Sequence, residues 1–377
     1  MLTSPDNGIP VLQSAEARRR RLVMPLVIAL AIVALIAALL AAGSPRQLAG
    51  AGSTLAQPLV ERASVDYRNA ANADNPDRPA QTGRDWTMDG SGLDYEPVGS
   101  MGGLMRLSEG QVGFAVSDYP LSEQALTDLR AAQFPVALGA VAVAYNVDLP
   151  PGQGLRLDAV TLADIYLGRV TTWNDPAIAR LNPGVTLPAQ PIEPLYRTDG
   201  SGSAFGLTTY LSAGSAAWRS GPGTGALVRW PHGTGVSRSG GMVSALGERP
   251  GSIGFVEIGQ AQRAGLRVAQ LRNGAGAFTA PEPAAMRAAT TGMDWSGARD
   301  YVGLATSADQ PGAYPVTVAI YAVMKRGEQR ETRRTLGFFA YLLDSSDASA
   351  ADLGYLPLPQ EAVDSVKTYW ATAFTAS

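Results

Sequence analysis

Residues 197–213 read RTDGSGSAFGLTTYLSA, a turn rich in glycine and hydroxyl side chains that leads directly into a helical run. Glycines let a backbone approach a ligand closely, and the first free N–H groups of a helix attract anions. Arg197 adds a fixed cation, and Asp199 stands two residues after it. An ordinary helix cap uses the same residue types, so this turn alone is a weak indication of an anion site.

Two further turns share this pattern. Residues 50–55 read GAGSTL and open a helix, and residues 99–103 read GSMGG before another helical run. Three glycine-flanked turns that all carry hydroxyl groups are a more specific signal than one. We therefore expect the three turns to meet around a single anion.

Asp118 follows the predicted strand 112–116 and is a candidate acceptor in this site, although an isolated Asp is more often a turn former. A carboxylate only accepts hydrogen bonds, so it would favour an oxyanion that still carries a proton, such as hydrogen phosphate. Sulfate has no proton at neutral pH, and a buried acceptor without a donor costs about 1–3 kcal/mol. Asp118 therefore predicts selection against sulfate.

Short apolar runs alternate with helical periods after residue 48, which predicts an α/β architecture. The expected strands cover 112–116, 136–145, 252–256 and 316–324. The expected helices cover 55–68, 162–167, 204–211, 332–343 and 361–374, the last with an apolar stripe that would face the core. Residues 72–94 are polar and rich in Asn, Asp, Pro and Gly, which indicates an exposed insertion.

The composition excludes several kinds of site. The chain of 377 residues has no cysteine, which excludes disulfides, iron–sulfur clusters and thiolate metal ligands. Its single histidine, His232, excludes a histidine-rich zinc site and is interpreted as a loop residue. A net charge of −3 argues against nucleic acid as a partner. We expect neither a cofactor nor a metal.

The N-terminal segment predicts a membrane-spanning helix. Residues 22–42 carry no charge and are long enough, as a helix, to cross the roughly 30 Å hydrocarbon layer. The arginines at 18–21 should keep residues 1–21 in the cytoplasm as a tail, with the rest outside. The alternative is a signal peptide cleaved near Ala42, although its apolar region usually has only about 7–15 residues. We expect a single-pass protein of the cell membrane with an extracytoplasmic binding domain.

From about residue 48 to residue 375 the chain resembles the PstS-type periplasmic phosphate-binding proteins of phosphate ABC transporters. The matching stretches, in order, are AGAGSTLAQP (49–58), GSMGG (99–103), VGFAVSDYPLS (112–122), FPVALGAVAVAYN (134–146), LADIYLGRVTTWNDPAIARLNPG (162–184), RTDGSGSAF (197–205), PGSIGFVE (250–257) and GMDWS (292–296). The resemblance implies a two-lobed α/β periplasmic-binding-protein fold of type II, here preceded by one N-terminal transmembrane helix. The first lobe would comprise 48–138 and 312–377, and the second 139–311.

The resemblance also implies which residues bind phosphate. They are Thr54, Leu55 (through its backbone N–H), Ser100, Asp118, Arg197, Ser201, Gly202 and Ser203. Asp199 falls where family members hold the arginine by an ion pair. Two positions depart from the family pattern: Leu55 stands where many members have Phe, and Ser203 where many have Thr.

These features predict a membrane-anchored receptor that passes inorganic phosphate to the permease subunits of an ABC transporter. A tethered phosphate sensor or scavenger without a transporter would have the same site, and the sequence does not separate the two. A hydrolase with Ser201 or Ser100 as nucleophile would need a base, and His232 has no adjacent acid motif. We therefore expect no enzymatic activity.

Overall fold

The computed structural model describes residues 48–71, 93–302, 308–327 and 330–374. The chain divides into two units, Met1–Arg46 and Gln47–Ser377, and all of the described residues belong to the second. The predicted tail 1–21, the predicted membrane-spanning segment 22–42 and residues 72–92 of the predicted insertion lie outside these ranges. Across the four described ranges, no helix combines the length and apolar character needed to span a bilayer.

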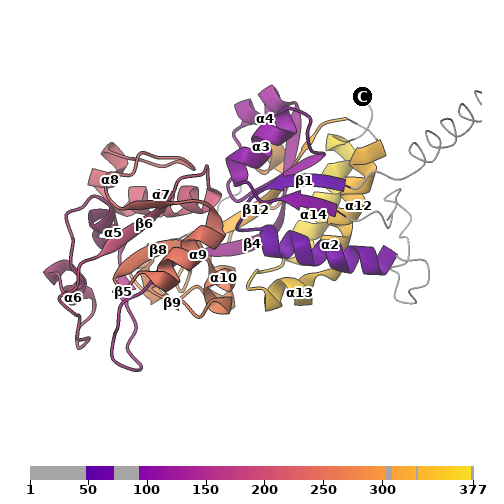
Figure 1. Ribbon diagram of the computed structural model, residues 1–377. Coiled ribbons are helices and arrows are strands. Elements are labelled where there is room, and N and C mark those ends of the chain that lie inside the picture. The colour runs from indigo at the N-terminus through magenta and orange to yellow at the C-terminus, as the bar shows by residue number, and fades with distance from the viewer. Residues whose placement is uncertain (1–47, 72–92, 303–307, 328–329, 375–377) are drawn as a thin grey trace, which may run out of the picture. The chain divides into compact units, whose positions relative to one another are not determined.

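One mixed sheet runs through the described chain, with its strands in the order β2-β1-β3-β12-β4-β8-β6-β7. Figure 1 shows β4 and β12 between the two halves of this fold. β4 (Ala131–Tyr145) is shared by both halves of this sheet. Ala131–Ala140 pair antiparallel with β12 (Thr317–Lys325) except at Val136, where the register shifts, and Val141–Tyr145 pair antiparallel with β8 (Ser252–Glu257). Every residue of β4 is buried, as expected for a central strand with both faces covered. The two lobes of the fold are joined along β4 and the segment that leads into β12.

The first lobe is built on β1 (Leu48–Gly52), which lies parallel to β2 (Leu93–Glu96) on one side and to β3 (Phe114–Ser117) on the other. Its helices are α2 (Gln57–Ala71), α3 (Ser100–Ser108), α4 (Glu123–Leu129), α12 (Arg330–Ser345), α13 (Asp347–Asp352) and α14 (Gln360–Ala373). Leu93 and Asp94, predicted to end the exposed insertion, instead begin β2. Pairing with Leu48 and Ala49 buries Leu93, which explains the difference.

The second lobe places β6 (Glu193–Arg197) parallel to both β8 and β7 (Thr234–Val236), while β9 (Arg267–Val268) pairs with β4. A small sheet contains β5 (Arg156–Leu157), β10 (Gln270–Arg272) and β11 (Phe278–Thr279). The helices are α5 (Ala159–Tyr166), α6 (Pro176–Leu181), α7 (Gly202–Gly214), α8 (Ala216–Ser220), α9 (Arg238–Glu248), α10 (Ile258–Arg263) and α11 (Pro283–Ala288). The predicted α/β layering is therefore present in both lobes.

A short 3-10 turn, Ala298–Tyr301, packs on the first lobe, although the predicted second lobe includes it. Arg299 forms an ion pair with Glu123 of α4, and the Tyr301 hydroxyl lies 3.1 Å from Ser365 Oγ of α14. These contacts depend on tertiary packing and had no local sequence signal. The other predicted lobe boundaries stay predictions.

Aromatic side chains fill the core of each lobe. In the first, Phe134 of β4 makes edge-to-face contacts with Phe339 of α12 at 5.4 Å and with Trp370 of α14 at 5.1 Å. In the second, Trp230 packs against Tyr166 and stacks on Phe255. Such pairs bury large apolar surfaces.

Candidate functional site

The carboxyl ends of parallel strands position the candidate residues. Thr54 follows β1, Ser100 begins α3 shortly after β2, and Asp118 follows β3 directly. Arg197 is the last residue of β6, and the turn after it leads into α7. Ligands of open α/β sheets bind outside the carboxyl ends of parallel strands, since loops and helix N-termini converge there. β6 of the second lobe runs antiparallel to β1 and β3 of the first, so each lobe contributes its own set of strand ends to the site. The side chains predicted to bind phosphate are buried, with exposed fractions between 0% for Ser100 and 4% for Thr54. Asp199 is partly exposed.

Asp118 accepts hydrogen bonds from serines of both lobes. Ser100 of the first lobe donates to Oδ1, and Ser203 of the second donates to Oδ2 at 3.1 Å. The Asp118 backbone N–H also donates to Ser100 Oγ at 3.3 Å. Burial raises the pKa of Asp118, although the Ser100 hydrogen bond and the charge of Arg197 oppose this shift. The carboxyl group thus lies in a dry environment in which hydroxyl donors are the groups that satisfy it.

Arg197 is the cation of the site, and Asp199 orients it. Nε donates to Asp199 Oδ1 at 2.8 Å, and Nη2 donates to Oδ2 of the same carboxylate. Burial disfavours the charge on Asp199, but the hydrogen bonds and charge of Arg197, with the Arg238 backbone N–H, outweigh it and lower the pKa of Asp199. This two-point ion pair fixes the plane of the guanidinium group.

The rest of the guanidinium group faces two hydroxyls from opposite lobes. Nη2 donates to Thr54 Oγ1 at 3.0 Å, and Nη1 donates to Ser239 Oγ at 3.2 Å. The two hydroxyl oxygens are themselves 2.8 Å apart. A buried cation with a fixed orientation and adjacent hydroxyl donors can hold a small oxyanion.

Two predicted residues use their polar groups in local capping interactions. The Leu55 backbone N–H donates to Ser53 Oγ at 3.1 Å, while the Leu55 side chain is buried. Ser201 is the N-cap of α7, and its Oγ accepts from the Ala204 N–H at 3.3 Å. A hydroxyl that accepts this bond still has its own hydrogen to donate.

Glycine at 202 is required by the close approach of the two lobes. A Cβ atom at this position would lie 2.0 Å from Asp118 Oδ1, far inside contact distance. Gly99 is constrained in a second way, since its φ of +84° is unfavourable for other residues and a Cβ would lie 2.8 Å from Asp199 Oδ2. The glycines of two predicted turns therefore let the lobes meet at the candidate site.

The structure brings together Thr54, Ser100, Asp118, Arg197, Asp199 and Ser203, and adds Ser239, which sequence reasoning missed. Ser239 lies in the first turn of α9 and is 2% exposed. Its surroundings, GVSRSGG at 235–241, lead from β7 into the first turn of α9 and carry hydroxyl groups next to glycines, as the other three turns do. This sequence pattern could have identified Ser239 as a candidate site residue. The described part of the chain contains no group of three or more acidic or histidine side chains able to hold a metal ion.

Comparison with known proteins connects this fold and site to a family. A family model described as a PBP superfamily domain matches residues 40–346. A phosphate-binding protein PstS of Xylella fastidiosa (strain Temecula1) is 35% identical over 331 residues, which cover 87% of this chain and 86% of that protein. The PstS of Pasteurella multocida (strain Pm70) is 34% identical over 291 residues, covering 76% of this chain and 84% of the relative.

Solved structures agree at the level of the fold. A high-affinity periplasmic phosphate-binding protein, PfluDING, solved with bound phosphate, superposes with a TM-score of 0.64 at 19% identity and covers 86% of this chain and 93% of its own. A phosphate-binding protein of Stenotrophomonas maltophilia gives a TM-score of 0.61 at 16% identity, with coverages of 86% and 94%. The chain has the two-lobed α/β fold of periplasmic binding proteins. It belongs to the PBP superfamily and, within it, to the family of the phosphate-binding protein PstS.

Proposed function

We propose that this protein is an extracytoplasmic receptor that binds inorganic phosphate and delivers it to the permease subunits of an ABC transporter. The observation that carries the proposal is the pairing of Asp118 with serine hydroxyls of both lobes, next to the oriented cation of Arg197. The relatives named phosphate-binding protein PstS support phosphate as the ligand.

The chemistry of the site favours phosphate over sulfate. Arg197 and the hydroxyls of Thr54, Ser201 and Ser239 can donate to the oxygens of a tetrahedral anion. The hydroxyls of Ser100 and Ser203 donate to it only when they turn away from Asp118, which then lacks these donors. Asp118 can accept only from an oxygen that carries a proton, which hydrogen phosphate has and sulfate lacks. The buried carboxylate thereby discriminates by leaving sulfate without a donor at this point, a penalty of about 1–3 kcal/mol or more for a charged group.

Movement of the two lobes would control access to the site. We place the first lobe at 48–138 and 312–377 and the second at 139–311, apart from Ala298–Tyr301, which packs on the first. Ligand-driven closure of two lobes about connecting strands is a common way to enclose a small molecule. A permease could then distinguish the loaded receptor by its closed surface.

The N-terminal segment would hold this receptor at the membrane. Residues 22–42 would span the bilayer once, with residues 1–21 in the cytoplasm. Only residues 43–47 would separate the span from the fold, a reach of roughly 18 Å at most. Such a short tether raises the effective concentration of the receptor near its permease.

A second candidate function, a tethered phosphate sensor or scavenger, would use the same site without a transporter. Deletion of the gene separates the two: a receptor predicts loss of phosphate uptake, whereas a sensor or scavenger leaves uptake intact. Enzymatic activity is not part of the proposal, and turnover of a phosphate ester by the purified protein would contradict it.

Calorimetric titration of the full-length protein with phosphate, sulfate and arsenate tests the ligand. We expect tight binding of phosphate, weak or undetectable binding of sulfate, and a large loss of phosphate affinity in Arg197→Ala, because a buried charged donor is removed. Arg62→Ala is a suitable control, since Arg62 is exposed and pairs with Asp66 away from the site. Equal affinity for phosphate and sulfate in the wild-type protein would reject the proposed role of Asp118.

A further inference from the structure

Two aromatic rings, one from each lobe, stack beside the candidate site. Tyr119 follows Asp118 in the first lobe, and Phe205 lies in the first turn of α7, two residues after Ser203. Their ring centroids are 5.1 Å apart with an interplanar angle of 29°. The stacked pairs Phe114–Phe338 and Tyr196–Trp230, in contrast, each lie within one lobe.

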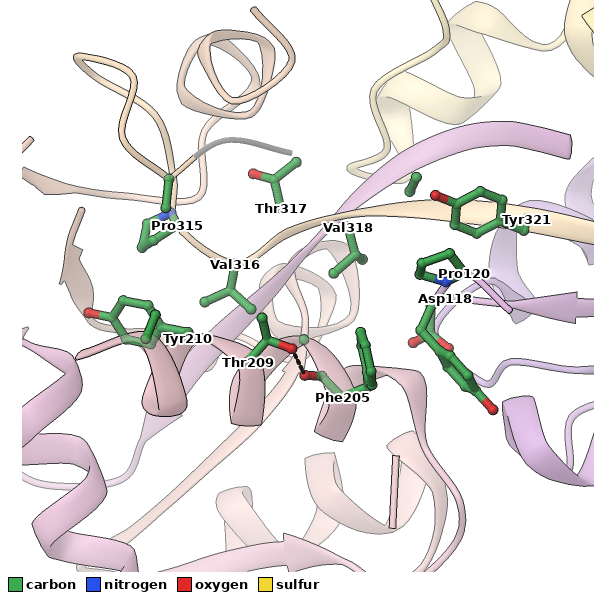
Figure 2. A pocket seen from close by; sticks show the side chains of 15 residues that line it. Asp118, Pro120, Phe205, Thr209, Tyr210, Pro315, Val316, Thr317, Val318 and Tyr321 are labelled. Carbon is green, nitrogen blue, oxygen red and sulfur yellow. Dashed lines mark hydrogen bonds between the residues drawn. The ribbon is translucent and has the colours of Figure 1, made fainter. Parts of the chain in front are cut away.

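The stacked rings border a cavity of about 350 Å³. Figure 2 shows Phe205 and Asp118 on its wall, with Val316 from the segment that leads into β12 and Val318 from β12 itself. Both rings are half-buried, so they are not locked in a close-packed core. Free space next to the pair lets the rings separate without a collision, which a densely packed interior would prevent.

We propose that Tyr119 and Phe205 form an interlobe latch that favours the closed arrangement of the lobes and slows the release of the bound anion. This inference rests on the proposed phosphate-binding function. The rings join segments that carry Asp118 and Ser203, whose own hydrogen bond crosses between the lobes at 3.1 Å. Opening of the lobes must therefore separate the rings and expose their apolar faces to water.

The latch acts through ring stacking rather than through the phenol group. Burial, followed by the charge of Asp118, raises the pKa of Tyr119 to about 12, so the ring stays uncharged across the physiological range. Stacked aromatic pairs stabilise by an amount that corresponds to about a 2- to 12-fold change in an equilibrium or rate. Tyr119→Phe should therefore keep the latch, and Tyr119→Ala should remove it.

Stopped-flow release of phosphate from the full-length protein provides the first test. We expect Tyr119→Ala and Phe205→Ala each to speed release about 2- to 12-fold with little change in the association rate, and Tyr119→Phe to release at the wild-type rate. The double variant should release no faster than the faster single variant, because one shared contact is lost. Tyr341→Ala is the matched control, since Tyr341 is also half-buried but contacts Tyr67 within the first lobe.

Unchanged release in both alanine variants, or effects that multiply in the double variant, would overturn the latch. If Tyr119→Ala does not fold, Tyr119→Leu takes its place, because leucine keeps apolar volume without a ring. The same rate changes are expected of it.

A second measurement tests the latch even if the wild-type protein binds no phosphate, an outcome that would reject only the proposed function. The chain has no cysteine, so spin labels would attach only to cysteines that are introduced. Val65→Cys in α2 and Val160→Cys in α5 place one label on each lobe, and both positions are about half exposed. Double electron–electron resonance then gives the distribution of distances between the two spin labels, one on each lobe. Addition of Tyr119→Ala should shift this distribution toward an open arrangement, and an unchanged distribution would reject the latch.

Discussion

Ser203 Oγ donates to Asp118 Oδ2 at 3.1 Å, which joins a helix N-terminus of the second lobe to a strand end of the first. Ser100 donates to the other oxygen of the same carboxylate. A carboxylate in this position is satisfied only by donors, so its replacement should change which anions the site accepts.

Asp118→Asn should relax discrimination against sulfate. The amide loses the negative charge and gains a donor, so sulfate is no longer left opposite a buried acceptor. With a penalty of about 1–3 kcal/mol removed, the ratio of phosphate to sulfate affinity should fall by about 5- to 150-fold. Competition titration measures this ratio, and Asp128→Asn on exposed α4 is the control. An unchanged ratio would count against Asp118 as the selective group.

Ser239→Ala should weaken phosphate binding although this residue was not predicted from the sequence. The change removes a hydroxyl that lies 3.2 Å from Arg197 Nη1 and 2.8 Å from Thr54 Oγ1. A hydrogen bond to a charged group contributes about 1.5–3 kcal/mol, so affinity should fall by roughly tenfold or more. Ser244→Ala is the control, since Ser244 lies on the exposed side of the same helix and bonds to Glu248. Wild-type affinity in Ser239→Ala would exclude Ser239 from the site.

Gly202→Ala should prevent the lobes from meeting at the site. The added Cβ would lie 2.0 Å from Asp118 Oδ1, and this oxygen also accepts from Ser100. We expect phosphate affinity to fall by at least a hundredfold, a cost of about 3 kcal/mol, while each lobe remains folded. Gly240→Ala is a strict control, because a Cβ there has nothing within 4 Å. Calorimetry and circular dichroism on both variants would reveal whether the effect is confined to binding.

Glu257 should make stability depend on pH. Its carboxylate is buried at the start of α10 and accepts from Gly259 N at 2.6 Å and Gln260 N at 2.9 Å. Burial raises its pKa from 4.5 to about 7, with these two hydrogen bonds opposing the shift. Because the pKa of Glu257 is raised in the folded state, its stabilising contribution to the free energy of unfolding is fully present below pH 4.5. This contribution is lost as pH rises through about 7.

In Glu257→Gln this loss should be absent. The variant's free energy of unfolding, relative to wild type, should therefore rise by about 3 kcal/mol between pH 4.5 and 8. Urea denaturation across this range measures the difference, with Glu248→Gln on the exposed face of α9 as control. Parallel pH profiles of wild type and Glu257→Gln would show that Glu257 does not titrate in this window.

Several features of the site could be predicted because their signals are local. Arg197 and Asp199 are two residues apart, and their ion pair forms within one turn. Helix starts are similarly local, since Ser201 caps α7 by accepting from Ala204 N three residues later. The apolar stripe predicted for 361–374 is confirmed by α14, in which Ala362, Val363, Val366 and Trp370 are buried.

The contacts between distant residues gave no local signal, although the sequence around Ser239 resembles the other three turns. Ser239 contacts Arg197 because α9 follows β7, and β7 pairs with the strand that ends in Arg197. The partnership of Tyr119 with Phe205 depends on how the second lobe meets the first. Leu93 became part of a strand because β1 pairs with it, and residues 298–301 joined the first lobe through contacts with α4 and α14.

The amino-acid sequence by itself determined the alternation of strands and helices, the glycine-flanked turns and the candidate charges, because periodicity and capping act over a few residues. Only the tertiary structure decided which hydroxyl meets which charge. Thr54 and Arg197 are 143 residues apart, and Asp118 and Ser203 are 85 residues apart. Such distant residues meet because the order of strands in the sheet, with β4 shared between its halves, brings the carboxyl ends of β1, β3 and β6 to a common place.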